Sequence, residues 1–186
     1  MSGIILASGS PRRKELMERA GLDFSIVTAD VDETIPGGTP PNEAVMALAV
    51  KKARAVSRDF PDRLVIGADT VVSIDGRILG KPSDEEDAHR MLLLLSGRMH
   101  RVYTGIAMIK NDRVKSFFDE TAVRFYKLSD EEIRAYIATG EPMDKAGAYG
   151  IQGRGCTLVQ RIEGDFFNVV GFPIAKIYRE MRDFDV

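Results

Sequence analysis

The stretch LVIGADTVVSIDGRIL, from Leu64 to Leu79, decides the class of fold. Its first part, up to Ile74, is apolar and rich in β-branched residues, which is typical of a buried strand. Asp75 and Gly76 then form a dipeptide that favours a tight hairpin turn, and a second apolar run follows. Because the two strands of a hairpin are antiparallel, this pair argues against a purely parallel sheet. The stretch therefore predicts a mixed sheet.

The sequence on both sides of this hairpin predicts further strands and helices. Helix starts are indicated by Ser or Asn caps, by prolines and by capping boxes. Strands are expected at residues 4–6, 24–27, 102–109, 114–126, 157–162 and 167–170. Helices are expected to begin at Pro11, Asn42 and Pro173, and at the capping boxes Ser83–Glu86 and Ser129–Glu132. The pattern predicts an α/β fold, a mixed sheet flanked by helices, in a single domain over residues 1–186.

Composition and charge are those of an ordinary globular protein. The chain has 186 residues, of which 44% are hydrophobic and 29% charged, and no apolar run approaches the length of a membrane span. The formal net charge of −2 argues against a general nucleic-acid-binding protein, which usually carries a basic excess. We expect no membrane and no nucleic acid as partner, no secretion signal, and a cytoplasmic location.

The chain has one cysteine and two histidines. Cys156 has no partner for an intrachain disulfide, and we expect it to be a small buried apolar side chain. His89 and His100 are too few and too isolated for a zinc site, so both are expected to be structural.

Asp69 is the costly residue of the long predicted strand. A carboxylate among apolar neighbours is strongly disfavoured by desolvation unless it is paired or bound to a metal. Gly67, just before it, leaves room for another backbone segment or a ligand. Asp69 is therefore a candidate functional residue, although a position that faces solvent, or an ion pair with an arginine, explains it as well.

A second unusual feature is a cluster of cations at a predicted helix start. Ser10 is a good N-cap and Pro11 suits the first helical position, and Arg12, Arg13 and Lys14 follow at once. A helix N-terminus is electropositive, so each misplaced cation should cost about 0.3–1 kcal/mol. A bound phosphate would reverse that sign, and helix N-termini are favourable phosphate sites. The alternative is that these long side chains simply reach into water.

Two lysines and a glycine-rich loop are further candidates. Lys52 lies on the apolar stripe of its predicted helix, where it either snorkels to water or serves a site, whereas Lys51 turns away. Lys81 lies between the hairpin and the next helix. The loop GAYGIQGRG fits a ligand-binding loop or a simple turn, and its Gln152 offers both a donor and an acceptor to a base edge.

Together these motifs resemble the Maf family of nucleoside triphosphate pyrophosphatases. The resemblance rests on SGSPRRKEL, GADTVV, GKP before a helix, LSG before a strand and GEPMDKAGAYGIQG, in the family's order over nearly the whole chain. It implies a fold related to the inosine triphosphate pyrophosphatases, with two lobes around a deep cleft. It also implies a house-cleaning hydrolase that cleaves a nucleoside triphosphate to the monophosphate and pyrophosphate. A divalent cation, Mg²⁺ or Mn²⁺, is the implied cofactor, and a homodimer is implied as well.

The resemblance assigns roles to individual residues. Asp69 matches the family's proton acceptor, and the sequence leaves open whether it acts as base, metal ligand or both. Glu33 is the expected second metal ligand, or else an exposed loop acid. The specificity positions of the subgroup that cleaves dTTP and UTP fall on Arg12, Thr70 and Gln152. Joined to the charge argument, the motifs assign the phosphates to Ser8, Arg13, Lys52 and Lys81.

Three functions stay open at this point. The first is a dTTP/UTP pyrophosphatase. The second is a related pyrophosphatase for a modified guanine nucleotide such as 7-methyl-GTP, against which Gln152 and Thr70 argue. The third is a non-enzymatic regulator of septum formation that acts through a protein partner. An intact set of charged motifs disfavours the third, because a scaffold does not need them.

Overall fold

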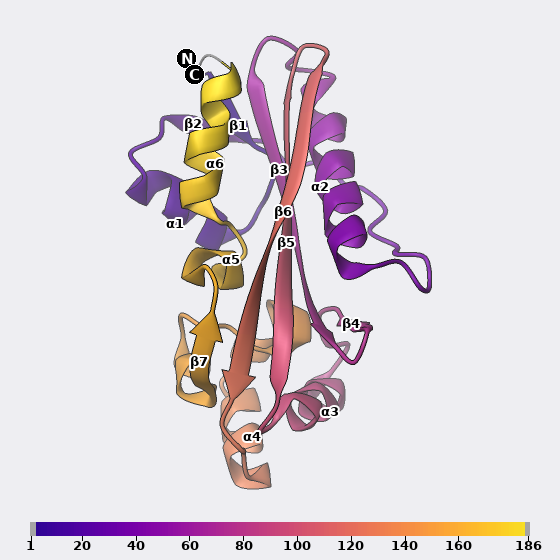
Figure 1. The fold of residues 1–186 in the computed structure, drawn as a ribbon, viewed down its shortest axis with the longest axis vertical. Coiled ribbons are helices and arrows are strands. Elements are labelled where there is room, and N and C mark those ends of the chain that lie inside the picture. The colour runs from indigo at the N-terminus through magenta and orange to yellow at the C-terminus, as the bar shows by residue number, and fades with distance from the viewer. Residues whose placement is uncertain (1–2, 185–186) are drawn as a thin grey trace. The chain divides into compact units, whose positions relative to one another are not determined.

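The computed structural model describes residues 3–184, which divide into two compact units. The first unit comprises the described residues up to Asp69, the segment Thr104–Asp119, and those from Gly171 onward. The second unit comprises Thr70–Tyr103 and Glu120–Val170. Figure 1 labels the helices and strands of both. The expected single domain and deep cleft stay predictions.

Within residues 3–184 the strands form a seven-stranded mixed sheet in the order β2-β1-β3-β5-β6-β7, with β4 paired to β3. β1 runs parallel to β2 and β3, whereas the pairs β3–β4 and β6–β7 are antiparallel. The bounds are β1 Ile4–Leu6, β2 Phe24–Ile26, β3 Leu64–Ile74, β4 Arg77–Leu79, β5 Met99–Lys110, β6 Arg113–Phe125 and β7 Val159–Glu163. The predicted mixed α/β class is confirmed.

Helices flank this sheet. The first unit contains α1 (Pro11–Arg19), α2 (Pro41–Ser57), α6 (Ile174–Glu180) and the short 3-10 helix η4 (Met181–Phe184). The second contains α3 (Glu85–Leu95), α4 (Asp130–Ile137), α5 (Phe166–Val170) and the 3-10 helices η1 (Glu141–Asp144), η2 (Ala146–Ala148) and η3 (Arg154–Leu158). No helix within residues 3–184 is long and apolar enough to cross a membrane.

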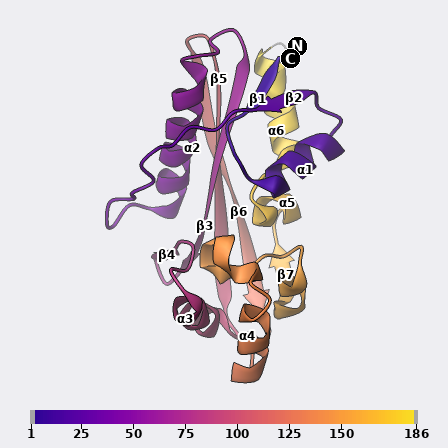
Figure 2. The same cartoon turned by 180° about the vertical axis from the view of Figure 1, so that it is seen from behind.

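In the first unit, helix α2 packs unusually close to the sheet. A Cβ atom on Gly67 of β3 would lie 2.5 Å from the carbonyl oxygen of Ala49, and one on Gly105 of β5 would lie 2.3 Å from that of Val45. The glycines therefore let the helix backbone approach the strands, which fits small residues on the helix face. Figure 2 shows α2 running alongside these strands. The apolar core here comprises Ile5, Ala7, Ala49, Ala53, Val56, Val65, Ala107 and Ile109.

The hairpin and the helix ends of the second unit form largely as predicted. Asp75 and Gly76 have φ values of 51° and 72°, the left-handed conformations that a two-residue type I′ turn requires. The capping box of α4 has both hydrogen bonds, with the backbone N–H of Ser129 donating to the Glu132 carboxylate at 2.7 Å. Gly140, with φ of 72°, follows the helix as its expected stop.

Two predicted helix starts are wrong in detail. Helix α2 begins at Pro41 with Pro40 as N-cap, because consecutive prolines already supply the required backbone, so Asn42 lies inside the first turn. The predicted capping box Ser83–Glu86 does not form, because the N-cap of α3 is Asp84, one residue later. The extended backbone of Asp84 places its own carboxylate to accept from the backbone N–H of Asp87 at 2.7 Å.

The strand predicted at 167–170 is helix α5 instead, and Cys156 is exposed rather than buried. A short apolar run does not by itself distinguish strand from helix. Here the carboxylate of Asp165 accepts from the backbone N–H of Phe167 at 2.9 Å, a local bond that turns the chain at the start of α5. Cys156 lies in η3, whose inward positions are taken by Gly155 and Leu158.

Candidate active site

A buried ion pair lies in the first unit. Asp69, near the middle of β3, is only 8% exposed, and the ammonium of Lys52 donates to its Oδ1 at 2.7 Å. Lys52 reaches it because α2 packs directly on β3 and the lysine lies beside the apolar stripe, as predicted. The solvent-facing alternative for Asp69 is therefore wrong. Its nearest cationic partner is a lysine seventeen residues earlier in the chain, rather than an arginine.

A second carboxylate contacts the same ammonium. The Oε1 of Glu33 lies 3.0 Å from Lys52 Nζ, and 55% of the Glu33 side chain is exposed. The loop that carries Glu33 is tied to helix α2, because the Lys51 ammonium contacts the Asp32 carboxylate at 3.1 Å. Hydrogen bonds from Thr34 and Lys51 lower the pKa of Asp32 to about 2. The loop acid predicted as a metal ligand is thus held beside Asp69's partner.

The environment of Asp69 suits a proton acceptor. Burial raises the pKa of Asp69, the ammonium of Lys52 and the guanidinium of Arg13 oppose that change, and Glu33 adds to it. The net direction is upward, so this carboxylate holds a proton more readily than an exposed one does. Perturbed carboxylates with a specific charged partner are common at functional sites.

Arg13 is fixed by the protein itself. Its Nε donates to the carbonyl oxygen of Gly171 at 2.9 Å, and one terminal nitrogen donates to the carbonyl of Ala68 at 2.9 Å and to Ser8 Oγ at 3.0 Å. Burial lowers the pKa of Arg13, an effect that Asp69 opposes, and an arginine in such a network stays charged. Arg13 thereby joins the loop after β1 to the residue that precedes Asp69.

The start of α1 keeps the features that predicted an anion site. The helix begins at Pro11 after Ser10, as predicted, but the Ser10 side chain makes no capping hydrogen bond, and the first turn contains no acid. The half-buried Arg12 lies in this turn beside Arg13. The helix N-terminus thus lacks the usual internal compensation for its exposed N–H groups. That phosphate binds there stays a prediction.

Three predicted residues belong to the second unit. Thr70 is half-buried, whereas Lys81 and Gln152 are exposed. The segment around Lys81 is joined to the glycine-rich loop, because Gly147 N–H donates to the carbonyl of Gly80 at 2.9 Å. Gly147 has a φ of 68°, and a Cβ there would lie 2.8 Å from Val72, so this junction requires glycine.

One residue of the glycine-rich region was not predicted. The carboxylate of Glu141 accepts hydrogen bonds from the backbone of Arg154 and Gly155 and from the hydroxyl of Tyr136. Glu141 is part of the motif GEPMDKAGAYGIQG, but no periodic pattern of apolar residues distinguishes it, since its partners lie on both sides of a turn. The available signal was an acid just after a helix stop, followed by a loop with many N–H donors.

Two carboxylates, those of Glu33 and Asp69, are available to bind a divalent cation. No group of three or more His, Cys, Asp or Glu side chains that could hold a metal occurs within residues 3–184. Mg²⁺, however, is commonly held by one or two carboxylates together with substrate phosphates and water. The carboxylates of Glu33 and Asp69 both contact the Lys52 ammonium, so the two already share one positive charge. These two residues are the ones that would hold the metal.

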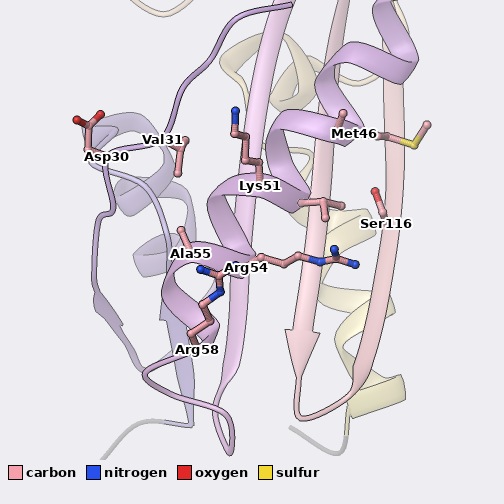
Figure 3. Close-up of a pocket in the computed structure, with 10 residues that line it drawn as sticks. Asp30, Val31, Met46, Lys51, Arg54, Ala55, Arg58 and Ser116 are labelled. Atoms are coloured by element: carbon pink, nitrogen blue, oxygen red, sulfur yellow. The ribbon is translucent and has the colours of Figure 1, made fainter.

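A separate pocket of about 880 Å³ lies in the first unit on another face of α2. Figure 3 shows Met46, Lys51 and Arg54 of the helix lining it, together with Arg58, which follows the helix, and Ser116 of β6 at one side. None of the predicted site residues lines this pocket. Lys51 and Lys52 therefore lie on different faces of the helix. The candidate active site is the cluster of Asp69, Lys52 and Glu33, with Arg13 nearby.

Comparisons of the whole chain with known proteins show its family. The family model described as Maf-like protein matches residues 3–184. The chain is 54% identical over its full length to a dTTP/UTP pyrophosphatase of Bacillus cereus (strain ATCC 10987 / NRS 248), covering 92% of that protein. It is 53% identical, again over its full length, to the dTTP/UTP pyrophosphatase of strain ZK / E33L, covering 97% of it. From the family match and from these identities, it follows that the chain belongs to the Maf-like protein family.

Proposed function

We propose that this protein hydrolyses dTTP and UTP to the corresponding monophosphate and pyrophosphate. The observation that carries the proposal is the buried pair of Asp69 and Lys52 with Glu33 beside it, in a chain that matches pyrophosphatases of that specificity over its full length. The names of those relatives supply the substrate class. The predicted homodimer and cytoplasmic location stay predictions.

Asp69 acts as the proton acceptor in this mechanism. It takes a proton from a water molecule as the water oxygen bonds to the α-phosphorus. The bond between the α-phosphorus and the bridging oxygen breaks, and pyrophosphate leaves with the electron pair. A positioned general base of this kind contributes about 10²–10⁴-fold to the rate. The upward shift of the Asp69 pKa brings its basicity closer to what this transfer requires.

Cationic side chains stabilise the charge that develops on the leaving phosphates. Lys52 and Arg13 are held in place by hydrogen bonds before any substrate arrives. Charges that need no reorganisation during the reaction stabilise a transition state most effectively. Arg12, Ser8 and Lys81 are assigned to the phosphates and nucleoside on the basis of the family motifs.

Glu33 and Asp69 would hold the divalent cation, Mg²⁺ or Mn²⁺, that we propose for this reaction. When bound, such an ion neutralises phosphate charge and lowers the pKa of water. In this arrangement Lys52 keeps the two carboxylates close to each other, which prepares them for a cation despite their mutual repulsion.

Removal of divalent cations is expected to abolish turnover, because the triphosphate charge is then only partly neutralised. The measurement is pyrophosphate release in EDTA, followed by addition of Mg²⁺ or Mn²⁺. Glu33→Gln should raise the Mg²⁺ concentration needed for half-maximal rate, whereas Glu43→Gln, at an exposed acid in the first turn of α2, should not. Full activity in EDTA would show that the metal assignment is wrong.

Base selection is assigned to Gln152, with Thr70 and Arg12. Uracil and thymine share an edge with one acceptor and one ring N–H donor, which an amide side chain matches. The extra methyl of thymine changes discrimination little in a pocket with room for it, by about 1–3 kcal/mol at most. UTP and dTTP should therefore both be good substrates.

The test is kcat/KM for UTP, dTTP, CTP, ATP, GTP and 7-methyl-GTP, with wild type and Gln152→Glu. The wild type should prefer UTP and dTTP, and the glutamate variant should lose both together, because it keeps the acceptor and loses the amide donor. A preference for GTP or its methylated form would support the sister specificity instead. An absence of turnover with every nucleotide would favour the non-enzymatic role.

A further inference from the structure

We propose that Glu141 is a positioning residue for base selection, because its carboxylate fixes the backbone of the loop that carries Gln152. This inference rests on the proposed function, in which Gln152 contacts the base. It concerns residues of the second unit alone. We call the loop from Gly150 to Gly155 the base loop.

The Glu141 carboxylate is bonded to the base loop through both of its oxygens. Oε2 accepts from the backbone N–H of Arg154 at 2.8 Å, and Oε1 accepts from that of Gly155 at 3.2 Å. Oε1 also accepts from the hydroxyl of Tyr136 at 2.9 Å, and that hydroxyl accepts from the N–H of Gly150 at 3.1 Å. One carboxylate and one phenol therefore hold both ends of the loop.

Glu141 is itself anchored to a packed helix. Tyr136, on α4, is 5% exposed and packs in the core of the second unit. The N–H of Glu141 donates to Thr139 Oγ1 at 3.1 Å, and the ammonium of Lys145 donates to the Glu141 carbonyl at 2.6 Å. The side chain consequently starts from a defined position, which a positioning residue requires.

The glycines of the base loop are explained by this contact. A Cβ on Gly153 would lie 2.3 Å from Glu141 Oε2, and one on Gly155 would lie 2.4 Å from the carbonyl of Gly150 and 2.7 Å from the Tyr136 hydroxyl. Both positions therefore have to lack a side chain for the carboxylate and the phenol to reach the backbone. The glycine density read from the sequence as a ligand loop or a turn serves this internal clamp.

Gln152 depends on the backbone for its position. Its side chain is exposed, and within residues 3–184 no side-chain hydrogen bond holds its amide. Its neighbour in the loop, Ile151, is buried, with 8% of the residue exposed. The amide is thus available for a ligand, while its location is set by the bonds at Gly150, Arg154 and Gly155. Cytosine presents the reversed donor and acceptor pattern, which an amide free to flip would also accept. Rejection of cytosine therefore requires that the bound substrate and the fixed loop hold the amide in one orientation.

A carboxylate is needed for this clamp, because both oxygens receive N–H or O–H donors. An amide in the same place presents one oxygen and one NH₂ group, so a donor faces a donor on one side. The substitution Glu141→Gln keeps the size and shape of the side chain while it breaks one side of the clamp. Glu132→Gln is the matched control, since Glu132 also accepts a backbone N–H, from Ser129 at 2.7 Å, at the start of α4 and outside the base loop.

The experiment measures kcat/KM for UTP, dTTP and CTP in wild type, Glu141→Gln, Tyr136→Phe and Glu132→Gln. Glu141→Gln should lose about 10- to 100-fold with UTP and dTTP, the scale expected for a misplaced contact group. Its activity with CTP should change less, so the UTP-to-CTP ratio falls. Tyr136→Phe should change the ratio in the same direction but less, and Glu132→Gln should leave it unchanged.

Two further readouts separate positioning from a general structural effect. Amide hydrogen exchange at residues 150–155 should quicken in Glu141→Gln and not in Glu132→Gln. In a Gln152→Ala background, adding Glu141→Gln should leave the UTP-to-CTP ratio unchanged, because the two residues act through one contact. A wild type that prefers purines would overturn the proposed function. A pyrimidine-selective wild type with an unchanged ratio in Glu141→Gln would overturn the positioning role alone.

Discussion

Asp69→Asn is expected to lower kcat by about 10²–10⁴-fold while nucleotide binding survives. The asparagine keeps the shape of the side chain and can still accept from Lys52, which donates to Asp69 Oδ1 at 2.7 Å in the native protein. It cannot take a proton from water. The measurement is single-turnover hydrolysis of UTP beside equilibrium binding of a non-hydrolysable analogue. A folded variant that keeps more than about a tenth of the wild-type kcat would exclude the general-base role.

Stability should respond in the opposite direction to activity. Burial raises the folded-state pKa of Asp69 above 3.8, so the protonated form is favoured by folding. That stabilisation is present at low pH and is lost as the pH rises through the folded pKa, which means that the charged form at neutral pH is costly. Asp69→Asn removes this cost while Glu33 still pairs with Lys52, so its Tm at pH 7 should equal or exceed that of the wild type.

The matched control is Asp59→Asn, at an exposed acid that follows α2. It should change neither kcat nor Tm. In the metal-free protein, the titration midpoint of the Asp69 carboxylate should lie above 3.8, the ordinary value for aspartate, because burial raises its folded-state pKa. A midpoint below that value would contradict this prediction.

The sequence predicted the part of the fold that depends on local signals. The turn at Asp75 and Gly76 requires left-handed backbone at both residues, which this dipeptide tolerates, and the helix stop at Gly140 has the same basis. The prediction of a strand at 167–170 failed because so short a run carries no decisive period, and the side chain of Asp165, outside the run, turned the chain.

The residues of the candidate site that could be predicted are charged side chains at positions where the sequence pattern indicates burial. Asp69 and Lys52 stand out because each lies on an otherwise apolar face, and such residues must find partners. Glu141 shows no such conflict between charge and burial in the sequence. Its partners include the backbone N–H groups of Arg154 and Gly155, which do not depend on the type of side chain. Two of the acceptors of Arg13 are likewise backbone groups, the carbonyl oxygens of Gly171 and Ala68, whose positions depend on the tertiary structure rather than on residue type.

Arg13 carries the second large expected effect, in both activity and stability. Arg13→Ala removes donors to the carbonyls of Gly171 and Ala68 and to the hydroxyl of Ser8. A buried acceptor left without a donor costs about 1–3 kcal/mol. The variant should therefore have a lower Tm than wild type. It should also show a lower kcat together with a higher KM, because in the proposed function its charge acts on the phosphates in the transition state as well as in the ground state.

Arg13→Lys should rescue neither property fully, and this is the sharper form of the prediction. An ammonium restores the charge, but it is a single point of donation, whereas Arg13 donates from Nε to Gly171 and from a terminal nitrogen to Ala68 and Ser8. Arg19→Lys is the control, since Arg19 is exposed and pairs with Glu15 one helical turn away. Thermal unfolding and steady-state kinetics with UTP measure both effects. If Arg13→Lys matches the wild type in kcat/KM and Tm, then charge alone suffices at this position, and the planar fork that joins the loop after β1 to the residue before Asp69 has no functional part.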